Sequence, residues 1–193
     1  GLGPSEFETS ERVALAKRTL RVLMVGQVLA SAGFASSVAV GVLVAKDLLG
    51  GDTFAGASGA AVTVGGAVAS LLLAGVMAAR GRRPGLVLGY GVAMIGALII
   101  VFGAQQRSFA VFILGSLLFG QAQGANQLAR YAAADLAPAD QRASYISNLL
   151  FASTFGGVLG PLLVGPAQRV GAALGLWKLT GPYIVAIGFF AVA

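Results

Sequence analysis

Amides and hydroxyls within the long uncharged stretches of this sequence, and one arginine at the end of such a stretch, are the side chains that could do chemistry. Gln123, Gln127 and Arg130 follow one another at i, i+4 and i+7. Asn126 lies four residues before Arg130, so all four side chains share one face of a helix. A cation and three amides at membrane depth are costly unless they face protein or water. The stripe therefore predicts a binding cavity or a solute pathway.

Arg130 also has a structural interpretation, which we prefer at this stage. It lies at the inner end of its apolar run, where a long side chain can extend to the lipid headgroups. We therefore expect Arg130 to stabilise the helix end or to take part in a cytoplasmic latch. Gln123 and Asn126 lie deeper in the run, and they could either line a cavity or only link helices.

The first apolar run adds Gln27 and Ser31, one helical turn apart. They either hydrogen-bond a substrate or link to a neighbouring helix. No acidic residue lies inside any complete apolar run, so a cavity of amides and hydroxyls favours neutral or anionic solutes over cationic ones. The predicted residues of the substrate cavity are Gln27, Ser31, Gln123, Asn126 and Gln127.

Several chemistries are excluded by residue types that the sequence lacks. There is no cysteine and no histidine, which removes disulfides, thiolate catalysis and imidazole ligation of metal or haem. No pair of buried carboxylates is available as acid and base, so we expect no catalytic residue and no enzyme. No P-loop is present, so ATP does not drive a process from this chain. We expect no metal site and no cofactor.

The composition predicts an all-α polytopic membrane protein. Only 10% of the residues are charged, against roughly a quarter in soluble domains. Uncharged runs of 17 or more residues can each cross the bilayer core as a helix. We expect residues 1–18 to be an expression-tag remnant and a cytoplasmic segment, and residues 19–193 to form a six-helix bundle with the last helix cut short. The expected spans are residues 22–45, 53–79, 84–106, 108–129 and 143–168, followed by a shorter run at 179–193.

The basic residues predict the orientation. With short connections the helices must alternate in direction, and nine of the 13 Lys and Arg residues then fall on one side. The positive-inside rule makes that side cytoplasmic, together with the amino terminus, and favours a cell membrane. Because the basic residues flank apolar runs and are not interleaved with aromatic ones, we expect no nucleic-acid partner.

Small residues recur at spacings of four, which predicts close contacts between helices. In lipid this spacing lets backbones approach, and van der Waals attraction then supplies association energy. A purely structural role suits most of these glycines. The pairs are Gly66 and Ser70, Gly85 and Gly89, Gly120 and Gly124, and Gly156 and Gly160.

Three segments together resemble the major facilitator superfamily of transporters. The first is G-V-M-A-A-R-G-R-R at 75–83, which is similar to the superfamily's basic loop signature, although Ala79 stands where the family has an acid. The second is 120–142, which resembles the glycine-rich fourth helix and its exit, with Gly120 in place of the arginine of drug–proton antiporters. The resemblance implies a cytoplasmic latch formed from Gly75, Arg80, Arg82, Arg83, Arg130, Asp135 and Arg142.

The third segment is F-G-G-V-L-G-P-L-L-V-G-P at 155–166. It resembles the fifth-helix element of the exporter branches, which in the family bends the helix and seals the two halves together. The resemblance assigns that bend and interface to Gly156, Gly160, Pro161 and Gly165.

The resemblance covers the chain from about Lys17 onward and implies the amino-terminal half of a twelve-helix secondary transporter. The implied activity is alternating-access transport of a small organic or amphipathic molecule, with efflux favoured by the fifth-helix element. Its partners would be a small-molecule substrate, the lipid bilayer and a carboxy-terminal six-helix half, in the same polypeptide or as a second copy. The alternatives are an importer of a nutrient or metabolite and a non-transporting membrane scaffold.

Overall fold

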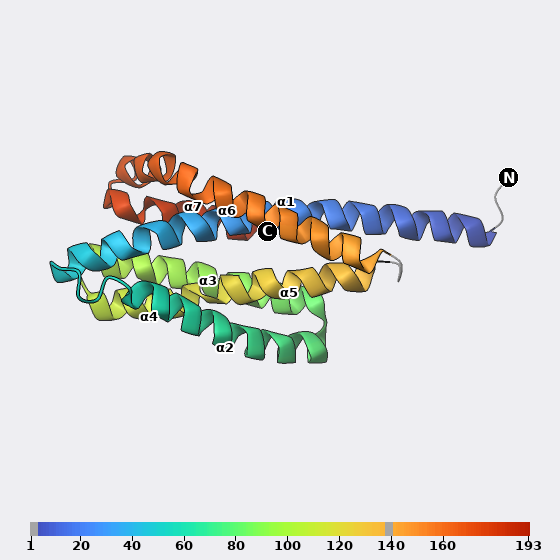
Figure 1. The fold of residues 1–193 in the computed structure, drawn as a ribbon, viewed down its shortest axis with the longest axis horizontal. Helices are drawn as coiled ribbons and strands as arrows, with labels where there is room; N and C mark the ends of the chain where they lie inside the picture. Colours follow the sequence, from blue (N-terminus) through green and yellow to red (C-terminus); the bar gives the residue numbers. More distant parts are fainter. Residues whose placement is uncertain (1–3, 138–140) are drawn as a thin grey trace.

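The computed structural model describes residues 4–137 and 141–193, which form a bundle of helices that run side by side along one long axis (Figure 1). The described residues contain seven α-helices, one 3-10 turn and no strand. The elements are α1 (Pro4–Leu49), α2 (Ala57–Arg80), α3 (Arg82–Gln105), α4 (Phe109–Phe119), α5 (Gln121–Leu136), α6 (Arg142–Ala173), η1 (Lys178–Thr180) and α7 (Gly181–Val192).

The distribution of side chains is that of a membrane protein, which confirms the predicted fold class. The interior holds many alanines, and its largest buried side chains include Phe112, Phe119 and Leu73. Large apolar side chains also cover the outside, where Leu71 is 79% and Phe151 is 70% exposed. Lipid solvates such a surface, whereas the backbone groups must be paired inside the helices. The chain is therefore a multi-pass α-helical membrane protein.

Four of the described helices are long and apolar enough to cross a membrane: Arg18–Leu49, Ala57–Arg80, Arg82–Gln105 and Arg142–Ala173. They correspond to four of the five expected complete spans. The expected span at 108–129 is instead two consecutive helices, α4 and α5, that are divided at Gly120. The run at 179–193 forms η1 and the 12-residue α7.

Gly120 marks both a change of helix geometry and a close helix crossing. The Gln123 N–H donates to the Gly120 carbonyl at 3.0 Å, an i to i+3 bond that tightens the turn. A Cβ at Gly120 would overlap the carbonyl oxygen of Val62 on α2. Here the backbones of two helices touch, and only glycine leaves room for that contact.

The other predicted small-residue contacts lie at further crossings. Gly124 meets Ala69 on α2, where an added Cβ would lie 2.6 Å from the alanine Cβ. Gly156 and Gly160 of α6 face α1, and a Cβ at Gly160 would lie 2.5 Å from the Cβ of Ala35. The glycines therefore determine how closely α2 approaches α5 and how closely α1 approaches α6.

The first helix is longer than the sequence pattern predicts. It begins at Pro4 and continues to Leu49, so it includes residues that we expected to precede the bundle. Its apolar part begins at Arg18. The first turns of α1 extend past the ends of the other helices (Figure 1).

Candidate functional site

A polar cavity of about 260 Å³ lies between α1, α5 and α6, within the apolar bundle. Four of its lining residues come from α1, four from α5 and two from α6. All five residues that the sequence predicted for a substrate cavity lie in its wall, and so does Arg130. The lining residues are Gln27, Ser31, Phe34, Ala35, Gln123, Asn126, Gln127, Arg130, Ser153 and Gly157.

Helix α5 presents its polar stripe to this cavity because its other faces are occupied by helix contacts. Gly124 packs on α2, and the Ala125 side chain lies against Gly89 of α3. Both Ala122 and Ala125 are fully buried. The helical period then leaves Gln127 and Arg130 on the side that faces α1 and α6, while Gln123 lines the cavity and also lies against Gly66 of α2.

Asn126 is the most firmly held member of the stripe. The Tyr90 hydroxyl of α3 donates to Asn126 Oδ1 at 2.5 Å, and Gln27 Nε2 of α1 lies 3.5 Å from the Asn126 carbonyl oxygen. These contacts link three helices beside the cavity. Tyr90 was not among the predicted residues, although it carries the one side-chain hydroxyl in the run at 84–106.

Arg130 lies in the cavity wall, and it forms no ion pair with any acidic side chain in the described part of the chain. Its Nη2 donates to Ser153 Oγ on α6 at 3.3 Å. Its Nε is buried and has no hydrogen-bond partner among the described residues. The structure therefore brings Arg130 together with the predicted cavity residues and separates it from the predicted latch.

Among the side chains that the structure describes, the basic end of the bundle, defined by Arg80, Arg82 and Arg83, contains one ion pair. Arg82 Nε, at the start of α3, lies 2.8 Å from Asp135 Oδ2, near the end of α5. The other predicted latch arginines, Arg80, Arg83 and Arg142, form no ion pair with any side chain that the structure describes. A Cβ on Gly75 would meet no atom within 4 Å.

The Arg82–Asp135 pair permits a charge-reversal test. We expect Arg82→Glu to lower the free energy of unfolding by about 1 kcal/mol or less, because both side chains are partly exposed. Restoring the attraction with Arg82→Glu/Asp135→Arg should recover most of that loss. Thermal unfolding in detergent measures both effects, with Arg80→Glu as the unpaired control. If the double variant lost as much free energy of unfolding as Arg82→Glu and Asp135→Arg lose together as single variants, the pairing would be contradicted.

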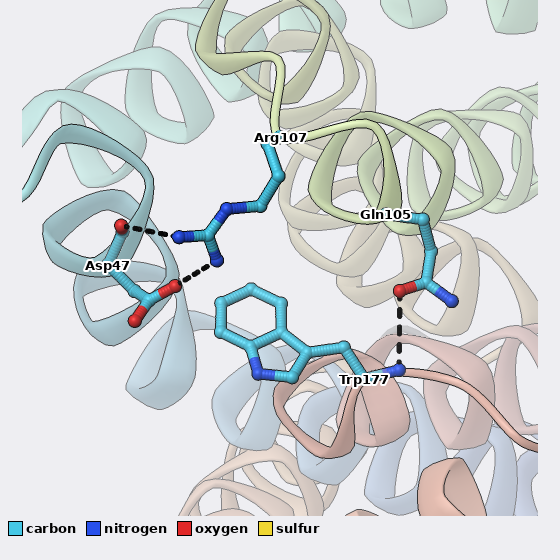
Figure 2. Close-up of polar contacts among 4 residues, drawn as sticks. All are labelled: Asp47, Gln105, Arg107 and Trp177. Atoms are coloured by element: carbon cyan, nitrogen blue, oxygen red, sulfur yellow. Dashed lines mark hydrogen bonds and ion pairs between the residues drawn. The ribbon is translucent and has the colours of Figure 1, made fainter.

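The opposite end of the bundle holds a second polar cluster, which the sequence analysis did not predict (Figure 2). Arg107 Nη1 donates to Asp47 Oδ2 at the end of α1, and the Arg107 guanidinium lies 5.9 Å from the centre of the Trp177 ring. The Trp177 N–H donates to Gln105 Oε1 at 3.3 Å. Arg107 has a φ of 55°, an uncommon conformation for a non-glycine residue. Arg107 thus links the end of α1 to the connection between α6 and η1.

The predicted fifth-helix element lies on α6, and its members have different surroundings. Gly156 and Gly160 contact α1, whereas a Cβ at Gly165 would meet no atom within 4 Å. Pro161 and Pro166 both lie inside α6, which remains one helix from Arg142 to Ala173. Within the described chain, the close contact of this element is therefore with α1.

A larger cavity of about 610 Å³ lies between α1, α3 and α7, next to the Arg82–Asp135 pair. Most of its lining residues are apolar, including Leu23, Leu86 and Phe190. Five of its 14 lining residues are polar or charged (Thr19, Arg82, Arg83, Tyr90 and Asp135), against seven of ten in the cavity between α1, α5 and α6. The smaller cavity at Arg130 is therefore the better candidate site.

Polar and ionisable side chains that face a cavity inside a membrane bundle are typical of solute pathways and binding sites. Comparison with known proteins agrees. The family model described as "Sugar (and other) transporter" matches residues 17–188. The chain is 36% identical over 180 residues to YdeG of Bacillus subtilis, an uncharacterized MFS-type transporter, covering 93% of this chain and 42% of the relative. The chain therefore belongs to the major facilitator superfamily and matches its sugar (and other) transporter family.

Two other relatives show the same partial coverage. YddS of Bacillus subtilis, also an uncharacterized MFS-type transporter, is 35% identical over 179 residues, covering 93% of this chain and 41% of the relative. The riboflavin transporter RfnT of Brucella anthropi is 29% identical over 149 residues, covering 77% of this chain and 37% of the relative. The chain spans about 40% of the length of these relatives. The family is one of transporters and not of enzymes.

Proposed function

We propose that this chain is the amino-terminal half of a secondary transporter that exports a small organic or amphipathic solute by alternating access. The observation that carries the proposal is the polar cavity between α1, α5 and α6. In a transporter of this kind two halves enclose the solute near the midplane. The described half supplies one wall, and a carboxy-terminal six-helix half, in the same polypeptide or as a second copy, supplies the other.

The two polar clusters at opposite ends suit alternating access. The Asp47–Arg107–Trp177 cluster ties connections together at one end, and the Arg82–Asp135 pair links α3 to α5 at the other. Both clusters are partly exposed, so each can break and re-form at small energetic cost. We propose that they stabilise different conformations of the transport cycle, and that the other predicted latch residues, Gly75, Arg80, Arg83 and Arg142, act at the basic end.

The excess of arginine and lysine at the basic end supports a cytoplasmic amino terminus in the cell membrane. The fifth-helix element, with Gly156, Gly160, Pro161 and Gly165, supports export. The second candidate is uptake of a nutrient or metabolite, and the 29% identity to a riboflavin transporter supports a metabolite as the solute.

Solute movement in vesicles tests the proposal. The chain, alone and joined to any residues that follow it in its gene, is reconstituted into liposomes with radiolabelled solutes of anionic, neutral and cationic type. We expect counterflow of at least one solute, and we expect Asn126→Leu to reduce it at least tenfold because that change removes a polar wall of the cavity. Thr63→Ala, an exposed change on α2, serves as the control.

Direction is measured in cells. Expression should lower the cellular content of the transported solute if the protein exports it. Accumulation inside the cells would select the importer. An absence of counterflow for every solute, with both forms of the protein folded, would contradict transport and favour a membrane scaffold.

A further inference from the structure

We propose that the cavity between α1, α5 and α6 binds an anionic group, with Arg130 as its charge partner. This inference rests on the proposed function, because the anion would be the charged group of the transported solute. The bound group would be a carboxylate or a phosphate-like group. Arg130 would then act in the cavity and not in the cytoplasmic latch that the sequence favours.

The first argument is the charge balance of the described side chains. Three acidic side chains are described, and each is already paired with another base: Asp47 with Arg107, Asp52 with Lys46 and Asp135 with Arg82. None of the residues that line the cavity is acidic. Within the described chain, Arg130 is therefore a cation in a membrane bundle without a counter-ion. Such a charge is costly unless water or an anion compensates it.

The second argument is the unused hydrogen-bonding capacity of the guanidinium. Arginine carries five N–H donors in a planar fork that matches carboxylate and phosphate oxygens. Of the described contacts, one joins Nη2 to Ser153 Oγ, and the buried Nε has none. An unsatisfied buried donor costs the desolvation energy of that group. An acceptor that enters the cavity would recover this energy.

The third argument is the set of neutral donors around Arg130. Gln123 and Gln127 carry side-chain amides, and Ser31 and Ser153 carry hydroxyls, all in the wall of the same cavity. Amides and hydroxyls donate to anion oxygens without adding a negative charge. A cavity with one cation, several neutral donors and no described acid is suited to an anionic group and would disfavour a cationic one.

The experiment uses the absence of cysteine from the sequence. Gln127→Cys puts a single thiol in the cavity wall, where residue 127 is exposed. Its modification is followed by mass spectrometry with two methanethiosulfonate reagents, one carrying a sulfonate and one a trimethylammonium group. The measured quantity is the ratio of the anionic to the cationic reaction rate. Thr53→Cys, at an exposed position between α1 and α2, calibrates the intrinsic ratio of the two reagents.

We expect the rate ratio at Gln127→Cys to fall about tenfold when Arg130→Gln is added, because the change removes a unit positive charge from the wall of the same cavity. Arg130→Lys should keep most of the ratio, because it keeps the charge. Arg169→Gln, at an exposed position of α6 outside the cavity, should leave it unchanged. The ratio at Thr53→Cys should not respond to Arg130→Gln. A change of less than twofold at Gln127→Cys would overturn the proposal.

Lipid phosphate is the other source of an anionic group, and a second arm distinguishes it. The same rates are measured in nanodiscs of phosphatidylcholine with and without phosphatidylglycerol, and in neutral detergent with added benzoate or benzamide. Protection of Gln127→Cys by benzoate and not by benzamide supports a solute site. Protection by phosphatidylglycerol without protection by benzoate would overturn the assignment to a solute.

The proposed function and this inference can fail separately. The rate ratios need no transport and are measured on protein that elutes as one species. If Arg130 controls the ratio and benzoate protects, but no solute moves in vesicles, the anion site stands and transport fails. If solutes move and Arg130→Gln does not alter the ratio, transport stands and the anion site fails.

Discussion

Replacing Gly156 by alanine should lower the free energy of unfolding by about 3 kcal/mol, an overpacking cost at the upper end of what single added carbons produce. The added Cβ would overlap the carbonyl oxygen of Val28 on α1 and would lie 2.9 Å from the Cβ of Ser31. A backbone carbonyl cannot move aside as a flexible side chain can. The two helices would therefore have to separate along one of the longest contacts in the bundle. Unfolding in mixed micelles with increasing sodium dodecyl sulfate measures the loss.

The neighbouring glycine provides the matched control. Gly157 lies one residue further along α6, and a Cβ there would meet no atom within 4 Å. Gly157→Ala should leave stability unchanged or raise it by up to about 1 kcal/mol, because alanine is the better helix former. Equal losses in the two variants would show that the α1–α6 contact is not responsible.

A carboxylate placed beside Arg130 should abolish the anion preference of the cavity while Arg130 is still present. Ser153 Oγ accepts from Arg130 Nη2 at 3.3 Å, so Ser153→Asp supplies the counter-ion that the described residues lack. An adjacent opposite charge cancels most of the field that an approaching anion feels. We expect the anionic-to-cationic rate ratio at Gln127→Cys to fall to within about twofold of its value in Arg130→Gln.

Ser153→Asn is the control for this change. Asparagine has nearly the size of aspartate and can accept the same hydrogen bond, but it carries no charge. The rate ratio should then stay near that of the Gln127→Cys parent. If Ser153→Asn lowered the ratio as much as Ser153→Asp, the effect would come from altered shape and not from charge compensation.

The sequence predicted the polar stripe on α5 but not the contact that Arg130 makes with another helix. Helical spacing placed Gln123, Asn126 and Gln127 on one face, and the structure adds the Gln27 face of α1 to the same cavity. Spacing within one helix could not identify which other helix lies opposite. For that reason it missed the Tyr90 hydroxyl on Asn126 and the Ser153 contact of Arg130.

The Asp47–Arg107–Trp177 cluster could not be predicted from the sequence, for a different reason. Asp47 lies in the last turn of α1, whereas Arg107 and Trp177 lie on two connections, and the three residues are remote from one another in the sequence. Their contact depends on the positive φ of Arg107 and on how three helix ends meet. The spacing of residues within one helix cannot predict such a contact between distant segments.

The sequence by itself determined that this protein is a helical membrane bundle of the major facilitator superfamily. In the hydrocarbon core of a membrane the backbone N–H and C=O groups must hydrogen-bond to one another. Long uncharged runs with basic flanks are therefore sufficient to predict helices. The close approach of those helices was also foreseeable from glycines spaced four apart. Only the tertiary structure decided what Arg130 faces. Because its surroundings come from α1 and α6 as well as from α5, its lack of a described counter-ion, and with it the proposed anion site, depends on contacts between segments far apart in the chain.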